Sequence, residues 1–259
     1  MNKIHIFVDG TWLFKVCSAG AALANTTDSP TYPFRFDWKK FDCAIKAHIS
    51  KNSSEDLVLG EKYIVTSIFN LPQDFDDWSN RFYDITDEQI KKTKNVIFAK
   101  TKFTESAISQ GYKNDAILRP EIKKWILQKL KDNIYQEKQV DTTVVALLVK
   151  SAIVNSNDYH AVISGDADML PAIRVAYPEY TNNVVMITTH PDELDSNKQH
   201  SSFSYLDFSF KIEPFYLQQN SEQIIQGEYI YKCVECGKVF SNTNQVPKHK
   251  QPRCHIHRT

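Results

Sequence analysis

The chain has 259 residues, 42% of them hydrophobic, and its 31 basic side chains balance its 31 acidic ones. This composition supports a buried core, and it argues against a disordered chain or one drawn to polyanions by its total charge. The charge is unevenly placed, because residues 229–259 carry six basic side chains and one acid (+5), which leaves −5 for residues 1–228. A basic tail on an acidic body indicates that the tail meets nucleic acid, although it also fits a plain Lys-rich end.

The sequence disfavours secretion and membrane insertion. No basic start followed by a long apolar stretch and a small-residue cleavage site is found, and no run of about 18 apolar residues occurs. Three of the five cysteines, Cys233, Cys236 and Cys254, lie close together, which favours reduced thiols and a metal site over disulfides. We therefore expect a cytoplasmic protein, with Cys43 as an ordinary small buried residue.

The apolar segments alternate between two patterns along the chain. Short runs rich in β-branched and aromatic residues predict strands, and longer segments with helical spacing of apolar side chains predict helices. Such alternation is typical of an α/β fold with a mostly parallel sheet. In chain order we predict a strand at 4–8, a helix at 38–50, a strand at 63–71, a helix at 74–94, a strand at 95–103, helices at 119–136 and 141–154, a strand at 160–164, a short helix ending near 177, a strand at 183–188 and a last strand within 208–215.

Four aspartates lie where such a fold binds ligands. Asp9 ends the first predicted strand, and Asp166 and Asp168 follow the strand that ends at residue 164. Asp141 opens a predicted helix. Ligands of parallel α/β sheets bind beyond the carboxyl ends of the strands. Clustered carboxylates repel one another unless a cation is present, and Mg²⁺ or Mn²⁺ prefers oxygen ligands. The pattern therefore predicts one or two such ions, which would activate water for phosphodiester hydrolysis.

Two of these aspartates also have a simpler interpretation. Asp141 at the start of a helix can cap that helix or complement its dipole. Asp9 before Gly10 fits an ordinary turn. Asp166 and Asp168, two residues apart after one apolar strand, fit a metal site better than a turn.

Three segments occur in a familiar order between residues 3 and 190: VDGTW around Asp9, KQVD around Asp141, and SGDADMLPAI around Asp166. They resemble the motifs of the NYN domain, a branch of the PIN-like nucleases, which has D-G-x-N after a first strand, K-x-V-D opening a central helix, and S-G-D-x-D-F-x-P-L/I. The resemblance implies a PIN-like (Rossmann-like) three-layer α/β/α fold and a metal-dependent endoribonuclease. Single-stranded or structured RNA is the implied substrate, and DNA is the alternative polymer.

The resemblance also implies roles for the acidic residues. Asp9 and Asp166 would hold the principal Mg²⁺ or Mn²⁺ ion, and Asp141 and Asp168 would complete the cluster directly or through water. Ser164 would help to set the turn after its strand.

Two further residues are candidates for contacts with the substrate. Lys138 is a candidate for a phosphate contact, although a lysine near a helix start is also often simply solvated. Trp12 beside the site is a candidate for stacking on a base.

The chain departs from the family motif at two positions. Trp12 stands where many relatives have Asn, and no second acid follows Asp141 within its helix. The ligand set is then smaller than is usual in the family. The alternative function is therefore a nucleic-acid-binding or regulatory protein with weakened catalysis. A phosphoryl-transfer enzyme for a small substrate is a third hypothesis, but such an enzyme has no use for a basic appendage.

The C-terminal residues have the spacing of a zinc finger. Cys233 and Cys236 form a C-x-x-C, His249 follows after 12 residues and Cys254 after four more. Thiolate and imidazole ligands select Zn²⁺, and a module this small needs its metal to fold. His255 or His257 could replace one of these ligands.

This pattern divides the chain into a nuclease domain at 1–217, a polar linker at 218–228 and a zinc-finger module at 229–259. The basic residues of the module are candidates for contacts with nucleic acid, although such a finger can equally bind a protein. They are Lys238, Lys248, Lys250 and Arg253.

Overall fold

In the computed structural model, the structure describes the chain in several stretches. These are residues 1–15, 35–77, 79, 85–122, 139–165, 169–188, 215–216, 225–226, 229–232, 234–236, 239–242, 251, 253 and 256–257. Every structural statement below concerns these residues. None of the described helices is long and apolar enough to cross a membrane.

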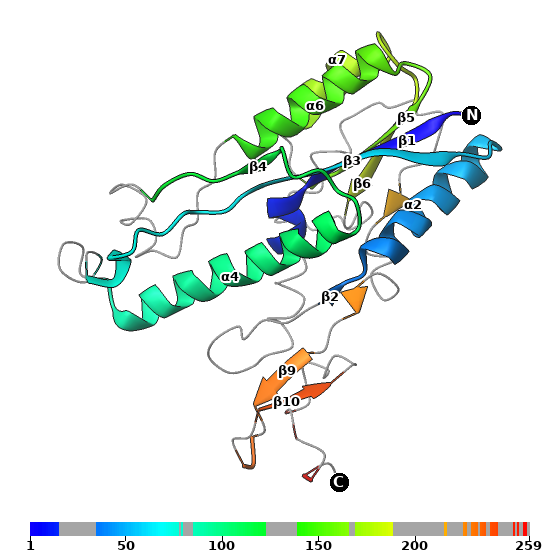
Figure 1. The fold of residues 1–259 in the computed structure, drawn as a ribbon. Coiled ribbons are helices and arrows are strands. Elements are labelled where there is room, and N and C mark those ends of the chain that lie inside the picture. Colours follow the sequence, from blue (N-terminus) through cyan, green and yellow to red (C-terminus); the bar gives the residue numbers. More distant parts are fainter. Residues whose placement is uncertain are drawn as a thin grey trace, which may run out of the picture.

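A six-stranded parallel sheet, in the order β4-β3-β1-β5-β6-β7, forms the centre of the described fold (Figure 1). β1 lies inside the sheet, and all of its residues after Lys3 are buried. The α/β class with a parallel sheet is therefore confirmed. The strands are β1 (Lys3–Asp9), β3 (Val58–Ser67), β4 (Ile117–Leu118), β5 (Tyr159–Ile163), β6 (Val184–Thr188) and β7 (Phe215–Tyr216).

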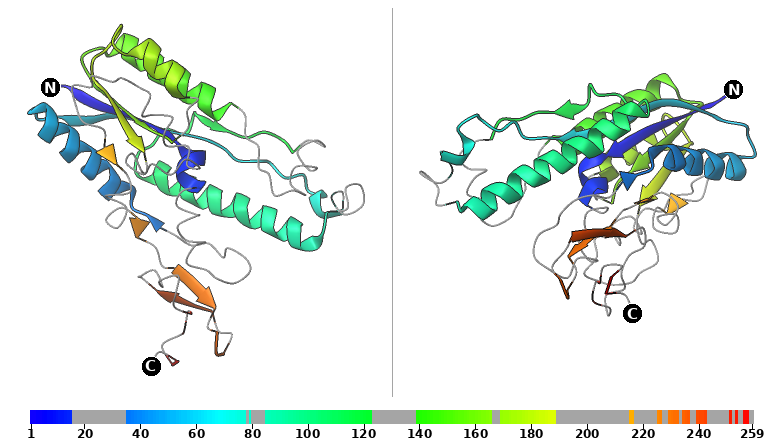
Figure 2. Two further views of the ribbon diagram at one scale, coloured as in Figure 1. Left: turned by 180° about the vertical axis from the view of Figure 1, so that it is seen from behind. Right: turned by 60° about the horizontal axis from the view of Figure 1, so that its bottom comes forward.

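Helices cover both faces of this sheet, which gives three layers (Figures 1 and 2). The helices are α2 (Trp38–Ser53), α4 (Asp87–Ser109), α6 (Val140–Val154) and α7 (Leu170–Ala176), and residues 10–15 form a further helical segment. Successive side chains of a strand point to opposite faces, so Ile6 of β1 packs with α2 and α4, whereas Phe7 packs with α6 and α7. The fold is thus Rossmann-like in its layers.

The prediction of a strand at 95–103 is wrong, because these residues form the middle of α4. The helix begins at a capping box, in which the Thr86 and Gln89 side chains bind each other's backbone N–H groups. Buried residues of α4 such as Phe103 and Ala107 then recur at helical spacing. The apolar run Val96–Phe98 resembles a strand only when it is considered alone.

Three further expectations have a structural outcome. The exposed side chain of Cys43 contradicts its prediction as a buried residue. Most of the predicted helix at 119–136 lies outside the described residues. The predicted linker 218–228 contains β8 (Ile225–Gln226), which pairs with β2 (Arg35–Phe36), so this segment contacts the body of the protein. Beyond it, β9 (Tyr229–Lys232) and β10 (Val239–Asn242) form an antiparallel hairpin.

Candidate functional site

Asp9, the last residue of β1, lies where the order of the strands reverses. From β1 the chain adds β3 and β4 on one side of the sheet and β5, β6 and β7 on the other. The crevice beyond the carboxyl ends of strands at such a switch point is the usual ligand site of open α/β sheets. The structure therefore places Asp9 at the edge where the sequence predicts a site.

The carboxylate of Asp9 is 3% exposed and is held by two hydrogen bonds. Its Oδ1 accepts from the backbone N–H of Trp12 at 2.9 Å, which is the contact of a helix N-cap. Its Oδ2 accepts from the hydroxyl of Ser164, just past β5, at 3.0 Å. An ionised carboxylate offers about four lone-pair sites, so these two donors leave acceptor capacity for a cation. The geometry of Asp9 fits a metal ligand.

Two glycines allow the chain to pack closely around Asp9. A Cβ atom added to Gly10 would lie 2.8 Å from Cγ1 of Ile64, because the turn after β1 lies directly on β3. A Cβ added to Gly165 would lie 2.4 Å from Nε1 of Trp12. The half-buried indole of Trp12 thus rests on the backbone of the Ser164–Gly165 turn, and its stacking on a base stays a prediction.

A buried cation lies beside the same turn, and the sequence analysis missed it. The Lys100 ammonium, from α4, donates to Oγ1 of Thr11 at 2.9 Å, and that oxygen lies 3.3 Å from Oγ1 of Thr66 on β3. Lys100 is only 7% exposed. Its helical spacing with the buried Phe103 and Ala107 is the signal that could have found it, but the prediction of a strand concealed that spacing.

Asp141 lies in the first turn of α6 and is half-buried. The N-cap position belongs to Gln139, which has a positive φ of 87° and makes no side-chain capping hydrogen bond. The hydroxyls of Thr142 and Thr143 both donate to the carbonyl oxygen of Gln139. Asp141 is therefore not the cap residue, and α6 packs on the sheet face that carries Phe7.

The remaining predicted site residues fall mostly outside the described part of the chain. Among the described residues, no group of three or more His, Cys, Asp or Glu could hold a metal ion. Cys236 is exposed, and Arg253 forms an ion pair with Glu235 at 3.0 Å. Both metal sites therefore stay predictions. Outside the described residues lie Asp166, Asp168, Lys138, Cys233, His249, Cys254, His255, Lys238, Lys248 and Lys250.

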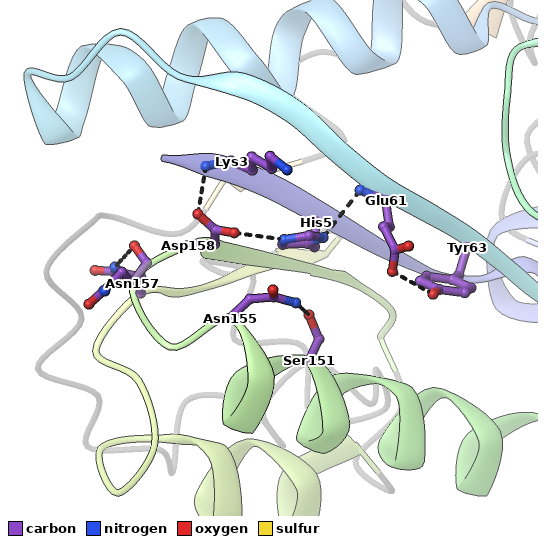
Figure 3. Close-up of polar contacts among 9 residues, drawn as sticks. Lys3, His5, Glu61, Tyr63, Ser151, Asn155, Asn157 and Asp158 are labelled. Atoms are coloured by element: carbon purple, nitrogen blue, oxygen red, sulfur yellow. Dashed lines mark hydrogen bonds and ion pairs between the residues drawn. The ribbon is translucent and has the colours of Figure 1, made fainter. Parts of the chain in front are cut away.

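A second polar cluster lies at the opposite, amino-terminal edge of the sheet (Figure 3). The Glu61 backbone N–H donates to Nδ1 of His5 at 3.1 Å, so the proton of a neutral His5 is on Nε2, which lies 3.0 Å from Oδ2 of Asp158. The Lys3 backbone N–H donates to Oδ1 of Asp158 at 2.8 Å. Burial acts to raise the pKa of Asp158, but the hydrogen bonds from Lys3 and His5 leave it below its ordinary value. This cluster ties the beginnings of β1, β3 and β5 together.

The comparisons with known proteins do not identify a family. No protein-family model matches the sequence, and no curated protein matches it. Among solved structures, the fold is similar to the crystal structure of a protein of unknown function from Vibrio parahaemolyticus. That likeness has a TM-score of 0.38 and 13% sequence identity, and it covers 73% of this chain and 82% of the other. A TM-score this low carries no argument about function.

Proposed function

We propose that the protein is a metal-dependent nuclease of the PIN-like class that hydrolyses phosphodiester bonds of RNA. The observation that carries the proposal is the carboxylate of Asp9, which is buried at the switch point of the sheet and held by Ser164 and the Trp12 N–H. A buried acid at the ligand edge of an α/β sheet is a candidate for chemistry rather than for solubility.

The residues around Asp9 would prepare the site before any substrate binds. Ser164 and the Trp12 N–H fix the direction of both carboxylate oxygens, and the bare backbone of Gly165 leaves space for the indole of Trp12. We place Asp141, Asp166 and Asp168 with Asp9 as the residues that would hold Mg²⁺ or Mn²⁺. The metal would supply a water of lowered pKa and a positive charge for the reacting phosphate.

The C-terminal module completes the proposal. Cys233, Cys236, His249 and Cys254 would hold a structural Zn²⁺, and the basic side chains of the module would bring RNA to the site. The pairing of β8 with β2 keeps the start of this module next to the body, which supports a shared substrate.

One specific observation favours an alternative function. After Asp141, the exposed and half-buried side chains of the first two turns of α6 are threonine, valine, alanine and leucine, so this helix adds no second carboxylate. A protein with this reduced set would bind nucleic acid or regulate another protein without cutting.

Replacement of Asp9 tests the proposal. We expect the native protein to cut labelled single-stranded RNA in Mn²⁺ or Mg²⁺ and to stop in EDTA. Asp9→Asn and Asp166→Asn should each lower the rate by on the order of a hundredfold or more, because the substitution removes a charge that holds the ion. Parallel assays with single-stranded DNA would show which polymer is preferred.

Asp56→Asn is the matched control, since Asp56 is an exposed aspartate just before β3 at the other edge of the sheet. It should cut like the native protein. Cleavage by Asp9→Asn at the native rate would contradict the site. Binding of RNA without cleavage in every ion would support the regulatory alternative.

A further inference from the structure

Lys100 brings a positive charge into the interior at the candidate site. It is 7% exposed, and its ammonium donates to the hydroxyl oxygen of Thr11. Thr11 follows Asp9 by two residues, and Thr66 follows Val65, the register partner of Asp9 on β3. Lys100 thus approaches the end of β1 from the side of β3, while Ser164 approaches Asp9 from the side of β5.

Burial of an ammonium is unfavourable unless negative charge lies close to it. A threonine hydroxyl accepts a hydrogen bond but is neutral, so Thr11 does not offset the charge of Lys100. The other deeply placed lysine of the described sheet region illustrates the usual solution, since Lys62 meets the carboxylate of Asp42 at 2.6 Å. A lysine in the core-facing stripe of α4 is therefore explained best by the acidic residues at the carboxyl edge.

A role as a simple tether explains Lys100 less well. Its neighbours on the buried face of α4 include Phe103, Thr104 and Ala107. An apolar residue at position 100 would fill the same space without the desolvation of a charge, and such replacements of buried ions are often neutral or stabilising. The charge itself therefore needs a reason.

We propose that Lys100 is a built-in cation of the acidic site, which lets the carboxylates hold a single divalent ion where they would otherwise need two. This inference rests on the proposed metal site at Asp9. A cluster of carboxylates is destabilised by mutual repulsion, and a fixed ammonium relieves part of it without occupying a coordination position. Lys100 is a positioning residue, because it acts through the carboxylates and Thr11 and does not touch the substrate.

The two roles predict changes of opposite sign when the charge is removed. Lys100→Met keeps much of the side-chain volume but removes a positive charge that repels divalent ions. The affinity for Mn²⁺ should then increase by roughly tenfold or more, and a second ion should bind. Loss of a mere tether would loosen the turn that carries Asp9, and the affinity for Mn²⁺ would fall or stay the same.

Calorimetric titration of Mn²⁺ into the full-length, zinc-loaded protein is the experiment. We expect one Mn²⁺ per native chain, tighter binding and a second ion for Lys100→Met, and native behaviour for Lys100→Arg, which keeps the charge. Lys91→Met is the matched control, since Lys91 is exposed on the same helix. Asp9→Asn should remove the binding altogether.

Unchanged or weaker Mn²⁺ binding by Lys100→Met would overturn the inference, as would an absence of Mn²⁺ binding by the native protein. Lys100→Gln serves as a second neutral variant if Lys100→Met does not fold. The titration needs no cleavage. A native protein that binds Mn²⁺ but cuts no RNA would refute the nuclease proposal, while the comparison with Lys100→Met would still decide the role of Lys100.

Discussion

The contact between Trp12 and Gly165 couples two segments that are far apart in the sequence. Trp12 donates its backbone N–H to Asp9, and its indole occupies the space that a side chain at position 165 would need. The sequence analysis noticed both residues, but for other reasons. Trp12 was considered as a base-stacking residue, and Gly165 as part of a motif. Only the three-dimensional contact shows that each one explains the presence of the other.

Gly165→Ala tests this coupling at the scale of single residues. The new methyl group would displace the indole, and we expect a loss of stability of about 1–3 kcal/mol together with weaker Mn²⁺ binding. Trp12→Ala in the same chain should remove the clash, so the double variant should lose less than the sum of the two single variants. Denaturant unfolding of all four proteins measures this difference, and strictly additive losses would contradict the contact.

Helix α4 shows why element boundaries were hard to predict. The run Val96–Phe98 has the residue types of a strand, yet Phe98 is 64% exposed on a helix. What decides the structure is the capping box at Thr86 and the helical spacing of the buried residues, which a short window does not include. The error had a cost for function, because Lys100 lies inside the segment that was predicted as a strand.

A buried ion pair joins three elements next to this helix. Lys62 on β3 bonds to Asp42 on α2 and to the carbonyl oxygen of Gln110 after α4, at 2.6 Å in each case. The Tyr112 hydroxyl donates to the second oxygen of Asp42 at 2.7 Å. Burial raises the pKa of Asp42, and the hydrogen bonds from Lys62 and Tyr112 offset part of that rise.

Removal of one partner of this pair should be much worse than removal of both. Lys62→Met leaves the carboxylate of Asp42 buried without its cation, and we expect a loss of roughly 3–5 kcal/mol in the free energy of unfolding. Lys62→Met combined with Asp42→Asn should recover much of that loss, because no buried charge is left. Thermal and denaturant unfolding measure both variants. An equal or larger loss in the double variant would show that the pair does not act as described.

At the scale of the whole molecule, the buried strands were the most predictable part. The runs at 4–8, 160–164 and 183–188 correspond to β1, β5 and β6, because a strand covered on both faces is apolar throughout. The position of Asp9 at the ligand edge follows from that pattern. The strand order does not, since it depends on how the helices pack, and the Lys100–Thr11 contact depends on the same packing.

The stability of the whole sheet should depend on pH through His160 of β5. Its ring is fully buried and stacks on that of His5, with centroids 5.7 Å apart. Burial, aided by the charge of His5, lowers the pKa of His160 from 6.5 to about 4, while Asp158 near His5 opposes this shift. The unfolded chain therefore binds a proton below about pH 6.5 that the folded chain refuses, so stability falls as the pH drops from 6.5 towards 4.

We expect this single group to remove roughly 3 kcal/mol of stability across that interval. His160→Leu should flatten the dependence of the free energy of unfolding on pH between 6.5 and 4, whatever it does to the stability at neutral pH. Urea unfolding at a series of pH values provides the comparison. A slope unchanged by the substitution would assign the acid sensitivity to other groups.

The pairing of β8 with β2 sets a distance for the C-terminal module. Gln226 is fixed opposite Arg35, and Tyr229, where the module begins, follows three residues later. Three residues of chain reach about 10 Å at most. Any nucleic acid that the module grips would consequently be confined to a small volume around the body, where its effective concentration exceeds that of free strands in solution. The protein would thus gain avidity from a short leash, without a single additional contact at the acidic edge.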